Sequence, residues 1–188
     1  MIIGIAGKIG SGKDTLAKFL KESLKSQQNE YSVEIYHFAN NLKKITAILT
    51  GIPYEEMLTR EVKQKRISFL NNITVRELLQ KLGTDVLRNH LSQNIWTHSL
   101  LNTYKEHEKK IWIIADVRFR SEVEYIKNLN GVVVHIIGNH LDTISKHPSE
   151  TDLDTYKDYD YACNNTLSLE NLQFFSNTLT RCILNERR

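Results

Sequence analysis

Short runs of apolar residues alternate along this chain with segments in which apolar residues recur at helical spacing. Five runs are of the first kind, and they cover residues 2–6, 33–38, 111–115, 132–137 and, more weakly, 159–163. Continuous apolar runs of this length are typical of strands that are covered on both faces of a sheet. We therefore predict a sheet of five strands.

Two segments next to these runs have a clear helical period. Residues 13–25 place Leu16, Leu20 and Leu24 on one face together with Phe19, and residues 169–183 do the same with Leu172, Phe175 and Leu179. Alternation of strands and helices predicts an α/β fold, in which a parallel sheet lies between layers of helices and the crossovers are right-handed.

The stretch from residue 40 to residue 109 contains no convincing strand. Helical patterns occur near residues 42–49, 75–87 and 96–104, so we expect an all-helical insertion between the second and third strands. The core then comprises residues 1–39 and 110–188 of one domain, residues 1–188. Turn residues concentrate at 51–53 and over 138–158, and a loop as long as the second is expected to be functional or mobile, as a lid is.

Composition excludes several classes of protein. The chain has 188 residues, of which 40% are hydrophobic and 25% charged, and 25 basic against 22 acidic residues give a net charge of +3. One soluble domain fits these values, whereas a nucleic-acid partner needs a stronger basic footprint. No apolar run is long enough for a bilayer and the first residues lack the pattern of a secretory signal, so we expect a cytoplasmic protein without a membrane partner.

Neither cysteine nor histidine spacing supports a metal site. Cys163 and Cys182 lie far apart and form no C-x-x-C pair, and the seven histidines show no H-E-x-x-H pattern. We expect both cysteines to be reduced and to serve in packing.

The strongest motif is G-x-x-x-x-G-K, which runs from Gly7 to Lys13 between the first strand and the first helix. Glycines let backbone N–H groups converge on phosphate oxygens, the start of the helix adds further donors, and Lys13 supplies a positive charge for the terminal phosphates. We call residues 7–13 the phosphate loop. The candidate residues for binding ATP at this loop are Gly7, Gly10, Ser11, Gly12, Lys13, Asp14 and Thr15.

Asp14 stands where this motif usually has Ser or Thr. A carboxylate is a hard oxygen ligand, so we predict that Asp14 holds Mg²⁺ directly or through water. The alternative is an acidic residue that is favoured in the first turn of a helix by the helix dipole.

A second charged group follows the third strand, where Asp116 precedes Arg118 and Arg120. The carboxyl ends of parallel strands border the ligand site of an open α/β sheet, which would bring these residues beside the phosphate loop. Asp116 is then a candidate for the Mg²⁺ shell, and the two arginines are candidates for stabilising a phosphoryl group in transfer. The alternative is a helix cap with two solvated arginines.

Arg76, Gln80 and Thr84 recur every four residues within the insertion, with Asp85 and Arg88 close behind. On a continuing helix the first three would form one stripe, which suits a phosphorylated small molecule that also makes hydrogen bonds. The alternative, an ordinary solvated helix face, fits the spacing at least as well.

The sequence resembles the deoxynucleoside monophosphate kinase family of largely virus-encoded P-loop kinases. The similarity covers most of the chain and is specific in four places: the phosphate loop ending G-x-G-K-D-T (10–15), the segment 76–85 with Trp96 beyond it, Asp116 with Arg118, and a carboxyl-terminal group. That last group comprises His147, Ser149, Glu150, Asp160, Asn165 and residues 168–172.

This resemblance implies a three-layer P-loop kinase fold with a helical acceptor-binding insertion and a lid. It implies phosphorylation of a deoxynucleoside 5′-monophosphate by ATP with Mg²⁺, in nucleotide biosynthesis, and relatives further imply a homodimer and a viral source with function in the host cytoplasm. Lys13, Asp116, Arg118 and Arg120 would be catalytic. The residues implied to bind the acceptor are Lys43, Arg76, Gln80, Thr84, Asp85, Arg88 and Trp96, and those near the adenine are Asn164 and Asn165.

Two other classes remain open at this point. A small-molecule kinase of the phosphomevalonate or dephospho-coenzyme A type is the stronger alternative, because phosphomevalonate kinases share a G-K-D-T loop. A non-catalytic nucleotide-binding module is the other. A GTPase is disfavoured, since no N-K-x-D run is present.

Overall fold

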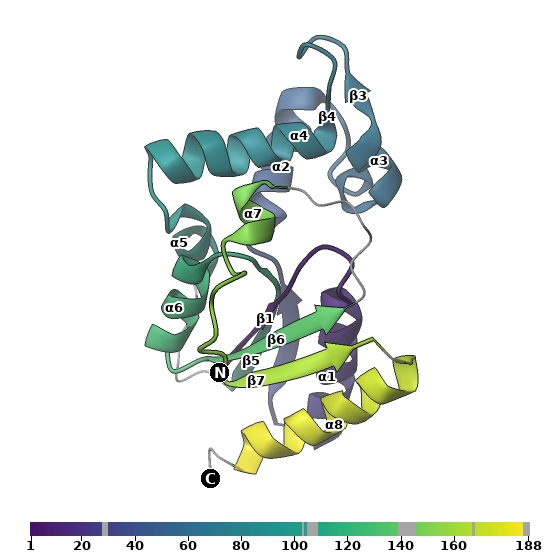
Figure 1. Cartoon of the computed structure of the whole chain (residues 1–188), viewed down its shortest axis with the longest axis vertical. Coiled ribbons are helices and arrows are strands. Elements are labelled where there is room, and N and C mark those ends of the chain that lie inside the picture. The colour runs from purple at the N-terminus through teal and green to yellow at the C-terminus, as the bar shows by residue number, and fades with distance from the viewer. Residues whose placement is uncertain (28–29, 103, 105–108, 139–145, 167, 186–188) are drawn as a thin grey trace. The chain divides into compact units, whose positions relative to one another are not determined.

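The computed structural model describes the chain except for residues 28–29, 103, 105–108, 139–145, 167 and 186–188 (Figure 1). Its contacts divide the chain into two compact units. Unit 1 comprises residues 1–37, 105–146 and 150–188, and unit 2 comprises residues 38–104 and 147–149.

Unit 1 is built on a parallel sheet of five strands in the order β2-β5-β1-β6-β7. The strands are β1 (Ile2–Ala6), β2 (Ser32–Tyr36), β5 (Lys110–Val117), β6 (Val132–Gly138) and β7 (Tyr161–Asn165). All five predicted strands are therefore confirmed, with ends that differ by a few residues. Both faces of β1 are fully buried, which explains its unbroken apolar sequence.

Helices cover both faces of this sheet. They are α1 (Lys13–Gln27), α6 (Arg120–Asn128) and α8 (Leu169–Asn185), whereas the short helix α7 (Pro148–Thr151) is divided between the two units. Leu16, Leu20 and Leu24 of α1 pack into one buried cluster with Ile3 and Ile5 of β1, and α8 joins the same cluster through residues such as Leu172. Successive strand residues face opposite sides, so Gly4 faces α6, where Ile126 leaves no room for a side chain. The predicted three-layer α/β/α arrangement is confirmed.

Unit 2 contains helices and one short hairpin. Its helices are α2 (Ala39–Thr50), η1 (Glu56–Leu58), α3 (Arg60–Gln64), α4 (Val75–Gln80), the π-helix η2 (Lys81–Arg88) and α5 (Ile95–Leu101). Met57, Ile67 and Val75 form its small buried cluster. Gly51 ends α2 in the left-handed region at φ 71°, as the predicted turn at 51–53 requires.

The prediction of an all-helical insertion was wrong. Strands β3 (Arg66–Ile67) and β4 (Ile73–Thr74) form an antiparallel hairpin. Its turn is made by Asn71 and Asn72, which adopt φ angles of 52° and 61°. Asparagine is among the few non-glycine residues that enter this left-handed region, so the pair of asparagines was the available signal.

Two helices of unit 2 also differ from the prediction. The predicted helix at 75–87 begins in the α conformation but continues from Lys81 as a π-helix, in which hydrogen bonds span five residues. The helix predicted at 96–104 is α5, which ends at Leu101, and residue 103 lies outside the described residues. In unit 1, α6 was not predicted. Part of the predicted lid loop, residues 139–145, also lies outside the described residues.

None of the helices in the part of the chain that the structure describes is long and apolar enough to cross a membrane.

Candidate active site

The phosphate loop connects β1 to α1, in the strand-to-helix context that the motif requires. Gly10 and Gly12 adopt φ angles of 77° and 98°, which glycine tolerates and other residues rarely do. A Cβ atom on Gly7 would lie 2.6 Å from the backbone oxygen of Ile136, so this glycine is required by close packing on β6. The loop conformation therefore depends on its three glycines.

Lys13 is buried at the first position of α1, and its Nζ donates hydrogen bonds to the carbonyl oxygens of Gly7 at 2.7 Å and Lys8 at 2.6 Å. Burial, and secondly the positive charge of Arg118, lower the pKa of Lys13 from 10.5 to about 7. The Lys13 amine thus lies against the phosphate loop, where its positive charge is poorly solvated. An anionic ligand would favour the charged form.

The predicted charged residues converge on Lys13. Besides Arg118, the groups that act on it electrostatically are the carboxylates of Glu150, Asp14 and Asp116, which raise its pKa. Asp14 follows in α1 and Asp116 lies near the end of β5, so the expected meeting of the β1 and β5 ends is confirmed. This convergence is the central electrostatic feature of the site.

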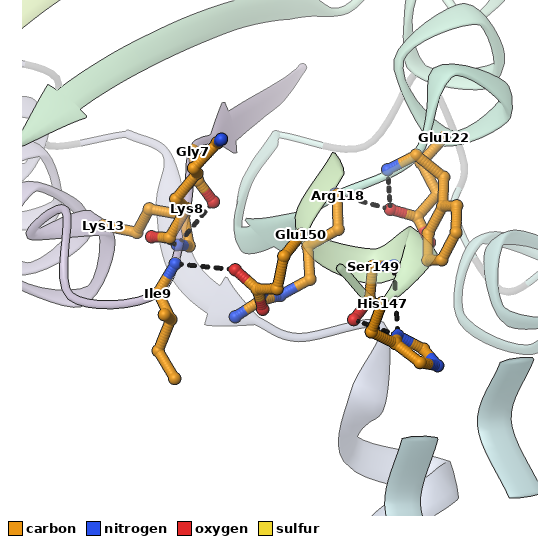
Figure 2. Close-up of polar contacts among 10 residues, drawn as sticks. Gly7, Lys8, Ile9, Lys13, Arg118, Glu122, His147, Ser149 and Glu150 are labelled. Carbon is orange, nitrogen blue, oxygen red and sulfur yellow. Dashed lines mark hydrogen bonds and ion pairs between the residues drawn. The ribbon is translucent and has the colours of Figure 1, made fainter. Parts of the chain in front are cut away.

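Arg118 is fixed by two acidic residues that the site prediction did not assign (Figure 2). Its backbone N–H donates to Oε2 of Glu122 at 2.8 Å, and the same oxygen accepts from the N–H of Phe119 at 3.1 Å. The guanidinium of Arg118 forms an ion pair with Glu150. Glu122 is buried, and its position near the start of α6 was the signal for a capping carboxylate.

Arg120 contacts the segment after α7. Its backbone N–H donates to Oδ2 of Asp152 at 2.7 Å, and its guanidinium donates to the carbonyl oxygen of Asp152 and to the hydroxyl of Thr155. Asp154 in turn pairs with Lys8 of the phosphate loop at 2.7 Å. The structure therefore gives Arg120 a role in attaching this segment, and its catalytic role stays a prediction.

Asn165 connects the last strand to the phosphate loop. Its Nδ2 donates to the carbonyl oxygen of Ser11 at 3.0 Å and lies against Gly12, where a side chain would collide with it. The neighbouring Asn164 is exposed. Asn165 thus positions the loop, a role that the sequence did not indicate, and the contact of both asparagines with adenine stays a prediction.

His37 is a further residue that sequence analysis missed. It directly follows β2, and its Nε2 lies 3.0 Å from Oδ1 of Asp14. Asp14 is largely exposed, with 77% of its side-chain surface accessible. The position of His37 after a strand, at the same sheet edge as Asp116, was the signal that could have found it.

The predicted acceptor residues belong to unit 2 and differ in exposure. Lys43 on α2 and Arg76 and Gln80 on α4 are half-buried. Thr84 and Arg88 are buried in η2, which continues α4 as a π-helix and not as the α-helix that the predicted stripe requires.

Three of these residues have structural contacts within unit 2. The guanidinium of Arg88 donates to the carbonyl oxygen of Gln93, and the indole N–H of Trp96 donates to the carbonyl oxygen of Gly83 at 2.9 Å. Oδ1 of Asp85 lies 3.7 Å from Nε2 of His147. Trp96 and Arg88 therefore stabilise the helices of unit 2, and a direct contact of any of the three with an acceptor stays a prediction.

His147 caps the start of α7, since its Nδ1 accepts from the N–H of Ser149 at 3.2 Å and lies 2.8 Å from the Ser149 hydroxyl.

Cys163 and Cys182 are both free, as expected, and burial raises the pKa of the Cys163 thiol. In the described part of the chain, no group of three or more His, Cys, Asp or Glu side chains is arranged to hold a metal ion.

A five-stranded parallel sheet, a G-x-x-x-x-G-K loop at a strand-to-helix junction and cations gathered at that loop define an α/β protein of the P-loop type. Comparison with known proteins narrows this class. The model of the deoxynucleotide monophosphate kinase family matches residues 48–174, which is more than half of the chain. The chain belongs to this family, and it is therefore a phosphotransferase.

Three relatives of this chain come from viruses. A protein of Acanthamoeba polyphaga mimivirus, provisionally named a deoxynucleotide monophosphate kinase, is 32% identical over 98% of this chain and 97% of its own length. The deoxynucleotide monophosphate kinase of Escherichia phage RB69 is 24% identical over 71% of this chain and 56% of that protein. The deoxynucleoside-5′-monophosphate kinase of Escherichia phage T5 is 22% identical over 80% of this chain and 84% of that protein.

Among solved structures, the shikimate kinase of Aquifex aeolicus aligns with 99% of this chain and 98% of its own at 16% identity. The TM-score of this alignment is 0.44.

Proposed function

We propose that this chain transfers the γ-phosphate of ATP to a deoxynucleoside 5′-monophosphate and forms the corresponding diphosphate. The observation that carries the proposal is the gathering of Lys13, Arg118 and the phosphate loop around one position in a protein of the deoxynucleotide monophosphate kinase family. Family membership also argues against the phosphomevalonate, dephospho-coenzyme A and non-catalytic alternatives.

Binding of the ATP phosphates would exchange the partners of Lys13. Its ammonium now donates to two loop carbonyl oxygens, and it would donate instead to phosphate oxygens that arrive at the loop. Arg118 would stabilise charge on the phosphoryl group during transfer, because a guanidinium matches the geometry of a phosphate. Asn165 would support both by holding the loop backbone in place.

Magnesium fits the carboxylates at this site. Asp14 and Asp116 both offer hard oxygen atoms, both act on Lys13, and one or two carboxylates together with substrate phosphates are the usual ligands of Mg²⁺ in such sites. When bound there, Mg²⁺ would neutralise charge on the phosphate oxygens. His37, 3.0 Å from Asp14, would orient that carboxylate.

The acceptor needs no general base from the protein. The second pKa of a phosphate monoester is near 6, so its attacking oxygen is already largely ionised at neutral pH. Positioning and neutralisation of charge are then sufficient. We propose that Arg76, Gln80 and Lys43, the half-buried polar residues of α4 and α2, contribute to holding the acceptor.

A coupled assay of ADP release tests the proposal. Wild-type protein with ATP and Mg²⁺ is given dTMP, dGMP, dCMP, dAMP or phosphomevalonate, and we expect turnover with at least one nucleotide and none with phosphomevalonate. Lys13→Ala should abolish turnover without loss of the fold, whereas the matched control Lys18→Ala, on the exposed face of α1, should retain it. Turnover of no nucleotide would overturn the proposal.

The acceptor side is tested by a second substitution. Arg76→Ala should raise the KM for the monophosphate and leave the KM for ATP unchanged. A change in the KM for ATP alone would show that Arg76 does not bind the acceptor.

A further inference from the structure

The side chain of Glu150 contacts the phosphate loop although it lies 141 residues further along the chain (Figure 2). Its Oε2 accepts a hydrogen bond from the backbone N–H of Ile9 at 3.0 Å. Its Oε1 pairs with the guanidinium of Arg118. The carboxylate also acts electrostatically on Lys13 and raises the pKa of that amine.

The two contact partners of Glu150 are a loop N–H and an arginine, and it also acts electrostatically on a lysine. These are the three kinds of group that bind a terminal phosphate in a P-loop kinase. A carboxylate can stand in for a phosphate here, because both are anions that accept charge-assisted hydrogen bonds from planar guanidinium and from backbone N–H groups. The contacts of Glu150 are therefore those expected of a bound phosphate oxygen.

We propose that Glu150 is a resident anion of the phosphate site, which pairs Ile9 and Arg118 in the nucleotide-free enzyme and is displaced by the terminal phosphate of ATP. This inference rests on the proposed function. Only 11% of the Glu150 side chain and 25% of the Arg118 side chain are accessible, so either charge would be poorly solvated without a partner. Glu150 supplies that partner until the phosphate arrives.

The surrounding contacts allow Glu150 to leave by itself. Asp152 is held by the backbone N–H of Arg120 at 2.7 Å, and Asp154 is held by Lys8 at 2.7 Å. Neither contact involves the Glu150 carboxylate. The segment that follows α7 can thus remain attached to unit 1 while one side chain exchanges with the phosphate.

A resident anion competes with an incoming phosphate, so its removal should lower the Kd for that phosphate. Inorganic tripolyphosphate is titrated calorimetrically into wild-type protein and into Glu150→Gln with EDTA present, so that neither metal nor acceptor contributes. We expect Glu150→Gln to lower the Kd for tripolyphosphate about tenfold, equivalent to about 1.4 kcal/mol. A residue with a merely structural role would give an unchanged or higher Kd when replaced.

Asp152→Asn is the matched control, because it removes one negative charge from the same segment without touching the phosphate loop. We expect its Kd to remain at the wild-type value. An unchanged or raised Kd in Glu150→Gln, or an equal fall in both variants, would overturn the inference.

Hydrogen exchange at the Ile9 amide gives a second measurement. Exchange without ligand should be faster in Glu150→Gln than in wild type, and tripolyphosphate should restore equal protection in both. If tripolyphosphate instead removed the protection of the Ile9 amide in wild type, this result would contradict the displacement of Glu150 by phosphate. The proposed function is tested separately by the turnover of the wild-type enzyme. If the wild type is active and Glu150→Gln has an unchanged Kd for tripolyphosphate, the role of Glu150 is contradicted and the proposed function is not.

Discussion

Binding of a phosphate chain to this protein should take up a proton, because the lysine that receives it is largely neutral above pH 7. Burial is the main cause that lowers the pKa of Lys13 to about 7 in the ligand-free loop. Bound phosphates place negative charge against the amine, which raises its pKa again. The protein with ligand therefore holds more protons than the protein without it.

The size of the effect follows from this pKa. A lysine with a pKa of about 7 is about one-tenth protonated at pH 8, so binding should take up about 0.9 protons there and about 0.5 at pH 7. If the bound amine stays charged throughout, the Kd should rise about 50-fold between pH 7 and pH 9. A lysine with the ordinary pKa of 10.5 would give almost no change over this range.

Calorimetry in buffers of different ionisation enthalpy measures the uptake directly. ATP with EDTA at pH 8 is a suitable ligand, because its single terminal phosphate has a pKa near 6, which lies well below that pH. Lys13→Arg keeps the positive charge but does not titrate, so it should show no uptake, whereas Lys18→Ala should behave as wild type. Uptake near zero at pH 8 in the wild-type protein, with binding intact, would refute this account of Lys13.

Three further outcomes follow from individual contacts. Thr74→Ala removes the hydroxyl that caps α4 by accepting from the N–H of Glu77 at 3.1 Å. In urea denaturation this substitution should lower the free energy of unfolding by about 1 kcal/mol, whereas Thr74→Ser should stay close to wild type. Trp96→Phe leaves the buried carbonyl oxygen of Gly83 without its indole donor and should lower the free energy of unfolding by about 1 to 3 kcal/mol in the same measurement. An unchanged free energy of unfolding would mean that this hydrogen bond contributes nothing to stability. Gly12→Ala places a side chain at φ 98° against Asn165 and should abolish tripolyphosphate binding, and a wild-type Kd would show that the loop does not need this geometry.

The sheet and the phosphate loop were predictable because local sequence determines them. The unbroken apolar residues of β1 are buried on both faces, and the motif that follows needs glycine wherever the backbone turns or packs closely. Asp116 and Arg118 could be placed beside the loop as well, since parallel strands end at a common sheet edge. That rule concerns topology and does not depend on detailed packing.

Features that depend on long-range contacts were not predictable in the same way. Glu150 and Asn165 reach the phosphate loop across 141 and 154 residues of sequence, and no spacing rule connects them to it. The change from α-helix to π-helix at Lys81 was also missed, because apolar periodicity does not separate the two in so short a segment. The hairpin escaped because its strands have only two residues each, too few to show alternation.

Identification of the phosphorylated product tests the central claim most directly. The protein is incubated with ATP, Mg²⁺ and the nucleotide that releases most ADP, and the products are followed by ³¹P NMR. The account predicts that the β-phosphate signal of a deoxynucleoside diphosphate grows in step with ADP, in the wild type but not in Lys13→Ala. Release of ADP with inorganic phosphate as the only other product would contradict it.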